Sequence, residues 1–254
     1  MSNVDKVIAT AKAEVGYLEK ATNSNLDSKT GNAGSGNYTK YARDLDKVSG
    51  FYNGRKNGHA WCDVFVDWCF WQTFGTVDAK KLLCQPSESL GAGCKYSMQY
   101  YQKKDQFYTD PKAGDQIFFI DSDGDGIAHT GLVYKVDSTY VYTIEGNTSS
   151  ASGVVANGGG VAEKKYSRSY ARIAGYGRPN YGSVAGSGGS TVSNVTVTNS
   201  TNYQCIHKAV KGDTLWALSK KYLGRGNRYT EIMSLNNKKN SGIKVGEKLK
   251  IPNK

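Results

Sequence analysis

The chain has 254 residues, of which 38% are hydrophobic, and this suits one large or two modest domains with packed cores. No apolar run approaches the length of a transmembrane helix, and charges interrupt the first apolar segment, so neither a membrane span nor a secretory signal is predicted. We therefore expect a protein that is made in the cytoplasm without a signal peptide and that does not associate with a membrane.

The formal net charge of +11 is unevenly distributed. Residues 204–254 hold 12 Lys and Arg against 3 Asp and Glu, a net charge of +9, which leaves +2 for the rest of the chain. Such a basic surface suits nucleic acid or another polyanion, and it is equally consistent with simple solubility.

Five cysteines occur, at positions 62, 69, 84, 94 and 205. Their number is odd and they lack paired C-x-x-C spacing, which indicates reduced thiols and argues against a zinc site. Pairing of Cys84 with Cys94 stays open, but burial of both thiols is the favoured interpretation.

In chain order, the hydrophobic spacing of the segment 4–19 first predicts a helix that ends at Gly16 and has one face on the core. Residues 22–37 then lose all periodicity, and their glycines do not form a phosphate loop, because no strand precedes them and no Gly-Lys-Ser/Thr follows. Further helices are expected over residues 38–44, from 62 onward, over 78–83 and over 95–103. Strands are expected over residues 115–120, 129–136, 140–146, 153–156, 160–166 and 171–177.

Cys62 stands where a loop rich in Gly and Asn gives way to a strongly aromatic helix. A thiol at a helix N-terminus has a lowered pKa, because the free N–H groups and the helix dipole favour the nucleophilic thiolate. A free cysteine is also often a small buried hydrophobe, so a partner must decide between the two interpretations.

His129 is the candidate base among the three histidines, since His59 is too close in sequence to Cys62 and His207 lies beyond a low-complexity segment. The hairpin of the strands 129–136 and 140–146 brings Glu145 near the start of the first strand, where it can orient His129. Asn147 would point the same way if the strand continues, because strand side chains alternate with period two.

These residues and the segment 111–119 resemble the CHAP family, the cysteine, histidine-dependent amidohydrolases and peptidases that cut amide bonds in bacterial peptidoglycan. The likeness rests on Trp61-Cys62, His129-Thr130-Gly131 and Glu145-Gly146-Asn147 and covers roughly residues 1–181. It implies an α+β fold with a papain-like domain of N-terminal helices and an antiparallel sheet.

The resemblance also implies site roles. Cys62 would be the nucleophile, His129 the base, Glu145 the orienting group and Asn147 a supporting one, with Trp61 and Tyr52 contacting substrate. The Cys62 N–H would be one oxyanion donor. Papain-like proteases take the second donor from a glutamine six residues before the cysteine, but Lys56 stands there, so Tyr52 or Asn57 is expected to substitute.

No cofactor or metal is expected. Residues 121–126 begin like a calcium loop, but Leu132 occupies the twelfth position, which a glutamate fills in such loops, so a hairpin turn is expected instead. Some CHAP relatives bind calcium near the nucleophile, and Asp44, Asp46 and Asp63 are the side chains that would serve here.

Residues 182–203 carry no charge and no helical period and are predicted to be a flexible linker, with a span on the order of 25 Å. Residues 204–254 then show the order βααβ and resemble a LysM domain, which binds glycans containing N-acetylglucosamine. The resemblance implies a ligand held between two loops, by the following residues: Gly212, Asp213, Thr214, Leu215, Asn236 and Ile243. An alternative interpretation is that Thr214 only caps a helix and Leu215 is core.

Together these features predict a monomeric peptidoglycan hydrolase with a catalytic domain over residues 1–181 and a wall-binding domain over 204–254. An N-acetylmuramoyl-L-alanine amidase acting as a phage or prophage endolysin is favoured. A stem-peptide or cross-bridge endopeptidase with the same site is the alternative, and an inactive wall-binding protein or a cysteine hydrolase of other proteins stays open. Peptidoglycan and anionic wall polymers such as teichoic acid are the expected partners, rather than nucleic acid.

Overall fold

The computed structural model describes residues 1–86, 91–124, 126–184, 203–210, 212–224, 228–236, 238 and 240–252, with only the backbone described for 203–206. The chain forms two compact units, Met1–Ser190 and Thr191–Lys254, called unit 1 and unit 2 below. No helix among the described residues is both long and apolar enough to cross a membrane.

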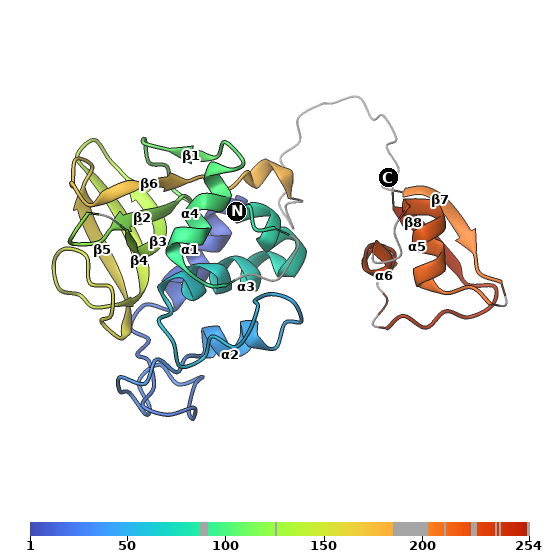
Figure 1. The fold of residues 1–254 in the computed structure, drawn as a ribbon, viewed down its shortest axis with the longest axis horizontal. Coiled ribbons are helices and arrows are strands. Elements are labelled where there is room, and N and C mark those ends of the chain that lie inside the picture. Colours follow the sequence, from blue (N-terminus) through green and yellow to red (C-terminus); the bar gives the residue numbers. More distant parts are fainter. Residues whose placement is uncertain are drawn as a thin grey trace. The chain divides into compact units, whose positions relative to one another are not determined.

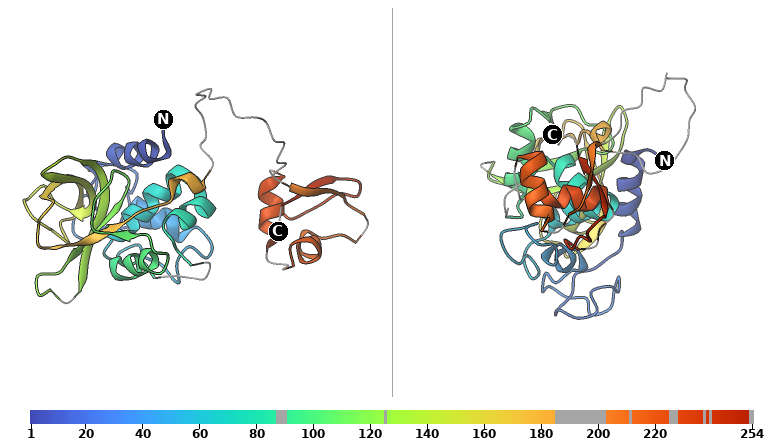
Figure 2. Two further views of the ribbon diagram at one scale, coloured as in Figure 1. Left: turned by 90° about the horizontal axis from the view of Figure 1, so that it is seen from above. Right: turned by 90° about the vertical axis from the view of Figure 1, so that its right-hand side faces the viewer.

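The described residues of unit 1 form four α-helices and one antiparallel sheet, which confirms the predicted α+β class (Figure 1). The helices are α1 (Asn3–Ala13), α2 (Lys40–Asp46), α3 (Cys62–Leu82) and α4 (Cys94–Gln102). The strands are β1 (Phe107–Tyr108), β2 (Gln116–Ile120), β3 (Ile127–Val136), β4 (Tyr140–Thr148), β5 (Gly160–Ser167) and β6 (Ile173–Gly177). Figures 1 and 2 show the sheet at one end of the unit and the helices grouped at the other.

The strand order is β1-β6-β2-β3-β4-β5, so β2 and β3 lie in the middle of the sheet. The prediction missed β1, and its strand over residues 153–156 was wrong, because those residues form bends and turns. The first helix is shorter than predicted and ends at Ala13. The described start of the predicted linker, residues 182–184, belongs to unit 1, where Val184 is buried; residues 185–202 lie outside the described part.

Helix α3 lies against β3 and β4, and the residues of its first turns, from Cys62 to Phe70, are buried. Its buried side chains Phe65 and Cys69, and Trp61 just before the helix, belong to one core cluster with Leu132 and Ile144 of the sheet. The helix is interrupted at Gly75, whose φ of 76° is open to glycine but unfavourable for other residues. The catalytic candidate Cys62 is therefore the first residue of the longest and most deeply buried helix in the described chain.

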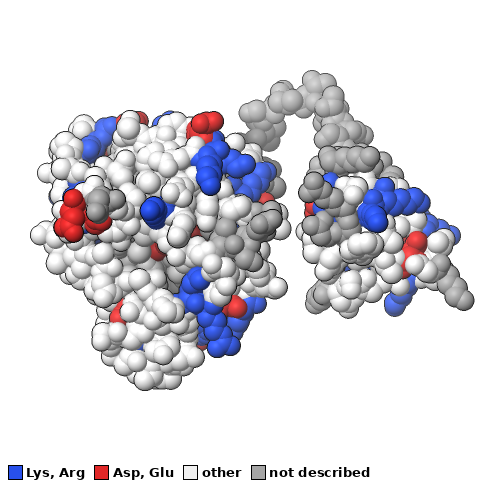
Figure 3. Space-filling model, in the orientation of Figure 1, with Lys and Arg blue, Asp and Glu red and all other residues white. Residues whose placement is uncertain are grey.

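Unit 2 follows the predicted order βααβ, with β7 (Tyr203–Lys208), α5 (Leu215–Leu223), α6 (Tyr229–Leu235) and β8 (Lys248–Pro252). The two strands pair antiparallel, and both helices pack on them. The core consists of Leu215, Leu218, Leu223, Ile232, Leu249 and Ile251. Figure 3 shows Lys and Arg side chains over the visible face of this unit, in keeping with the net charge of +9 on residues 204–254.

We expect Gly146→Ala to destabilise unit 1 by about 1–3 kcal/mol, the usual cost of an overpacked core. A Cβ at this position would lie 2.5 Å from the Phe65 Cβ and 2.9 Å from the Trp61 Cζ3, so α3 would have to move away from β4. Urea unfolding measures the difference. The control is Gly54→Ala, because nothing lies within 4 Å of the added Cβ there. Equal midpoints for the two variants would contradict the close approach of helix and strand.

Candidate active site

The Cys62 thiol lies at the open end of α3, and no side chain caps this helix terminus. Its exposed fraction is only 6%. The Asp63 N–H of the first turn hydrogen-bonds the thiolate and contributes to a lowered pKa, as expected where helix N–H groups face a negative charge. The helix start thus supports the thiolate, although the hydrogen bond with Cys94 is the largest cause of the lowered pKa.

His129 and Glu145 form a fully buried pair across β3 and β4. The distance from His129 Nε2 to Glu145 Oε2 is 2.9 Å, and both side chains have zero exposure. Glu145 also accepts hydrogen bonds from the Thr143 hydroxyl (2.5 Å) and the Tyr166 hydroxyl (3.2 Å), and the Phe119 ring stacks on the imidazole. The carboxylate is thus held from three directions and fixes the imidazole through Nε2.

The other imidazole nitrogen, Nδ1, has no conventional hydrogen-bond partner among the described residues and is the one left to serve the thiol. Burial alone lowers the pKa of His129, but interactions with Cys62 and Glu145 raise that pKa to about 10. A hydrogen bond from Cys94 is the largest cause of the lowered pKa of Cys62; burial opposes it, and His129 adds to it. Both pKa shifts favour the thiolate–imidazolium form of the pair.

Gly131, two residues after His129, leaves the room that Glu145 needs. A Cβ on Gly131 would lie 2.4 Å from the Glu145 Cγ. The sequence His129-Thr130-Gly131 of β3 thus provides both the base and, at Gly131, the space that the Glu145 side chain of β4 needs.

The structure brings Cys62, His129 and Glu145 together, but it does not add Asn147. The register between β4 and β5 shifts between Glu145 and Thr148, and Asn147 has a φ of 54°, so the period-two rule fails at this position. Both side-chain polar atoms of Asn147 are buried without a hydrogen-bond partner among the described residues. The predicted support of His129 by Asn147 is therefore wrong.

The predicted substrate contacts of Trp61 and Tyr52 are also wrong, because both side chains belong to the core. Trp61 has zero exposure and donates its indole N–H to the Glu19 carboxylate at 2.8 Å. Tyr52 is 9% exposed and donates its hydroxyl to the Asp67 carboxylate at 2.7 Å. Asn57 likewise has both amide atoms engaged, with Asn23 and the Thr39 N–H. The single hydroxyl proton of Tyr52 is thus already used, and Asn57 gives one of its two amide N–H groups to Asn23.

Two residues that the sequence did not assign to the site lie directly beside the nucleophile. The Cys94 Sγ is 3.4 Å from the Cys62 Sγ, so Cys94 is next to Cys62 rather than paired with Cys84. Asp63 is fully buried and accepts hydrogen bonds from the Gly93 N–H and the Ser97 hydroxyl. Burial first, and then the Cys62 thiolate, raise the pKa of Asp63 to about 6. The only sequence signal was the position of Cys94 at the start of a predicted helix.

The carboxylates proposed for calcium do not converge. Asp44 binds Arg43 and the Trp68 indole, Asp46 accepts two backbone N–H groups, and Asp63 faces α4. Within the described ranges, no group of three or more His, Cys, Asp or Glu side chains could hold a metal ion. These residues therefore do not fit a calcium site.

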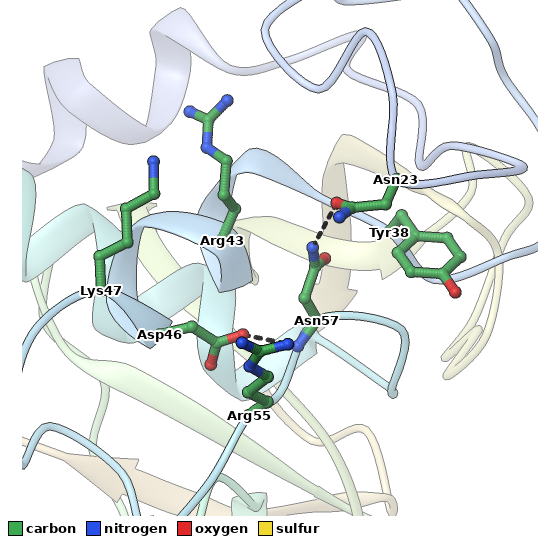
Figure 4. A pocket seen from close by; sticks show the side chains of 7 residues that line it. All are labelled: Asn23, Tyr38, Arg43, Asp46, Lys47, Arg55 and Asn57. Atoms are coloured by element: carbon green, nitrogen blue, oxygen red, sulfur yellow. Dashed lines mark hydrogen bonds between the residues drawn. The ribbon is translucent and has the colours of Figure 1, made fainter.

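A cavity of about 520 Å³ lies beside α2, but it does not contain the catalytic candidates (Figure 4). It is lined by Asn23, Tyr38, Arg43, Asp46, Lys47, Arg55 and Asn57. Arg43 is neutralised there by Asp27 and Asp44, and Asn57 bonds Asn23 across the cavity. Its side chains include no nucleophile with a neighbouring base, so this cavity is not the catalytic centre.

Unit 2 has a separate cavity of about 420 Å³. It is lined by Asp213, Thr214, Leu215, Trp216, Tyr229, Ser241, Gly242 and Ile243. The predicted residues Asp213, Thr214, Leu215 and Ile243 meet there, and two aromatic side chains, Trp216 and Tyr229, were missed. Thr214 caps α5 and Leu215 is core, so both also have the structural roles considered above.

The structure does not bring Asn236 or Gly212 to this cavity. The Asn236 amide donates to the Ile232 and Lys250 carbonyls and accepts from the Lys250 N–H. This side chain therefore ties α6 to β8. Gly212 has a φ of 95° in the turn before α5, a conformation that favours glycine.

We expect Glu145→Gln to move the alkylation profile of Cys62 to higher pH by about one unit, because the carboxylate that stabilises the imidazolium is removed and the imidazolium in turn stabilises the thiolate. Iodoacetamide labelling across a pH series, followed by mass spectrometry of the Cys62 peptide, measures the shift. The matched control is Glu163→Gln on the exposed face of β5. An unchanged profile for Glu145→Gln would remove Glu145 from the site.

Comparison with known proteins agrees with this geometry. Residues 54–147 match the model of the CHAP domain, and residues 207–252 match the model of the LysM domain. No curated protein matches the chain. Among solved structures, the chain is similar to "The crystal structure of Ly7917", with 14% sequence identity and a TM-score of 0.41. The match covers 71% of this chain and 63% of the solved chain, which is less than two thirds of the length of the solved chain. The chain therefore carries a CHAP domain within unit 1 and a LysM domain in unit 2.

Proposed function

We propose that this protein is a peptidoglycan hydrolase that cleaves an amide bond with Cys62 as the nucleophile. A CHAP domain indicates a peptidoglycan amidase or endopeptidase, and a LysM domain indicates binding to the cell wall. The observation that carries the proposal is the buried pair of His129 Nε2 and Glu145 Oε2 at 2.9 Å, which leaves Nδ1 for the Cys62 thiol. This is the arrangement of nucleophile, base and orienting group that covalent catalysis requires.

In the proposed reaction, the Cys62 thiolate attacks the amide carbonyl and forms a tetrahedral intermediate. The His129 imidazolium gives its proton to the leaving amine, which departs as the thioester forms. Water then attacks the thioester, His129 accepts a proton from that water, and the carboxylic acid leaves as the Cys62 thiolate is restored. Glu145 holds the imidazole through Nε2 and stabilises the imidazolium.

The oxyanion of the intermediate needs hydrogen-bond donors, and the backbone N–H of Cys62 at the start of α3 is placed to supply one. The helix dipole adds to this stabilisation, because its positive end faces the developing charge.

Within this class we propose the N-acetylmuramoyl-L-alanine amide as the bond that is cut. This bond joins the glycan strand to its peptide, so it lies next to the sugars that a LysM domain binds. Cleavage within the stem peptide or the cross-bridge is the second candidate, since the same three side chains would serve it.

We propose that the unit 2 cavity receives N-acetylglucosamine-containing glycan, with Trp216 as the main contact surface. Trp216 is 54% exposed and lines the cavity beside Tyr229, and large exposed aromatic side chains commonly provide binding energy. The surrounding Lys and Arg residues assist the approach to anionic wall polymers, although Arg228 and Lys238 already pair with Glu231 and Glu247.

We expect Cys62→Ala to lower the hydrolysis of purified peptidoglycan by about 10³-fold or more, because it removes the thiolate and the neighbouring Cys94 thiol has a pKa raised well above its usual value by its hydrogen bond to Cys62 and by burial. Turbidity loss and release of new amines measure the rate. Cys69→Ala is the control: Cys69 is fully buried, with a pKa raised well above its usual value by burial, so its loss should cost about 1 kcal/mol of stability and little rate. Undiminished hydrolysis by Cys62→Ala would refute the mechanism.

Mass spectrometry of the digestion products identifies the bond. Peptides with a new L-alanine N-terminus and intact glycan chains are expected from an amidase, whereas new amines within the peptide would identify an endopeptidase instead. If the wild-type chain binds walls and releases no product, the protein acts only as a wall-binding protein.

We expect Trp216→Ala to weaken binding to peptidoglycan by about tenfold, because it removes the largest contact surface of the cavity. Pull-down should be done in the Cys62→Ala background, so that the wall stays intact, and on walls stripped of teichoic acid. Val245→Ala is the matched control, since Val245 is 72% exposed and does not line the cavity. Retention by Trp216→Ala equal to that of the control, or loss of all binding in moderate salt, would mean that charge alone holds the domain.

A further inference from the structure

The thiols of Cys62 and Cys94 form a contact that the proposed hydrolysis does not use. Their Sγ atoms lie 3.4 Å apart, and each cysteine is the first residue of its helix, α3 or α4. A disulfide has an S–S distance of about 2.05 Å, so the two atoms need to approach by about 1.4 Å to be bonded. The two helices therefore already hold both sulfurs within reach of one bond.

Asp63 holds this contact from both sides of Cys94. Its Oδ2 accepts from the Gly93 N–H at 2.8 Å and from the Ser97 hydroxyl at 2.9 Å, and its Oδ1 accepts from the Gln116 amide at 3.1 Å. The residue next to the nucleophile thus fixes the first turn of α4. The position of Cys94 beside Cys62 is built into the packing of the site.

The two thiols differ in the way that sequential oxidation requires. Cys62 is the thiolate and reacts first with an oxidant, whereas the pKa of Cys94 is raised well above its usual value by its hydrogen bond to Cys62 and by burial. The negative charge of Cys62 also raises the pKa of Cys94 by repulsion. When oxidation removes that charge, both this repulsion and the hydrogen bond to the thiolate are lost. Cys94 then gives up its proton more easily.

The other cysteines whose side chains are described do not share this arrangement. Cys69 lies in the core with zero exposure, and Cys84 donates its thiol to the Gln106 side-chain carbonyl at 3.1 Å. Burial raises the pKa of Cys84 to about 11. Cys84 belongs to the same buried cluster as Cys62 and Cys94, but the sulfur–sulfur contact of 3.4 Å joins Cys62 to Cys94.

We propose that Cys62 and Cys94 form a reversible disulfide when the protein meets hydrogen peroxide. The Cys62 thiolate attacks one oxygen of the peroxide, the O–O bond breaks, hydroxide leaves, and Cys62 becomes a sulfenic acid. The Cys94 sulfur then attacks the Cys62 sulfur, the S–O bond breaks, and the departing hydroxide takes the Cys94 proton as water. The two sulfurs supply the two electrons that reduce the peroxide.

The effect on hydrolysis rests on the proposed function, because the disulfide consumes the nucleophile, whereas formation of the bond does not depend on that function. A dithiol such as dithiothreitol restores both thiols by exchange. Cys94 would also protect Cys62, since the disulfide forms before further oxidation to the irreversible sulfinic acid.

The test uses the full chain treated with hydrogen peroxide and digested without reduction. The expected product is one cross-linked species that joins the peptides of Cys62 and Cys94 and lacks the mass of two hydrogen atoms. Hydrolysis, where present, should fall with the rise of this species and return with dithiothreitol. Because the cross-link is read by mass, it tests the proposal even if the chain proves not to hydrolyse peptidoglycan.

Two variants sharpen the result. Cys94→Ser keeps a hydroxyl donor beside Cys62 but cannot form the disulfide. Peroxide should therefore convert Cys62 of this variant to sulfinic acid. Dithiothreitol should then fail to restore the activity that the untreated variant shows. Cys84→Ser should behave as the wild type does. Sulfinic acid at Cys62 of the wild type without a cross-link, or a cross-link to a cysteine other than Cys94, would overturn the proposal.

Discussion

The close approach of α3 to β4 is the constraint on which the site depends. Gly146 has no side chain where the helix crosses the strand, so Trp61 and Phe65 lie directly against the strand backbone. Trp61 is further tied by its indole N–H to Glu19. Gly146 follows Glu145 directly in the chain. The contact that positions α3 on β4 therefore also positions the Cys62 thiol relative to the Glu145 carboxylate. Core packing and catalytic geometry are therefore the same feature of this fold.

The electrostatics of the site are dominated by the His129 imidazolium, which lies among acidic groups. The imidazolium of His129 is flanked by the Cys62 thiolate and the Glu145 carboxylate, and Asp63 adds a further buried acid beside the thiol. The imidazolium favours the thiolate form of Cys62, and the thiolate in turn favours the imidazolium. Asp63 shows the remaining imbalance, since burial and the thiolate raise its pKa to about 6. Its hydrogen bonds to Gly93 and Ser97 compensate in part for this burial.

Local patterns predicted the parts of the protein that obey them. Helical spacing located Cys62 at a helix start, and the short turn after β3 brought Glu145 to His129. Asn147 failed because a positive φ breaks strand alternation, and Trp61 was misassigned because sequence does not reveal whether an aromatic side chain faces the core. The contact of Cys94 with Cys62 joins two helices that are distant in sequence, and no local rule encodes such a contact.

The sheet also determines when the catalytic centre can exist during synthesis. Strand β2 lies between β3 and β6, so one of its edges stays open until residues 173–177 have been made. The Asn3 amide of α1 then donates to the Tyr181 and Val184 carbonyls, which joins the first helix to the last turn of the unit. The segment 54–147 that matches the CHAP model is thus shorter than the compact unit that contains it. A ribosome must release nearly the whole of unit 1 before this sheet and its tie to α1 can be complete.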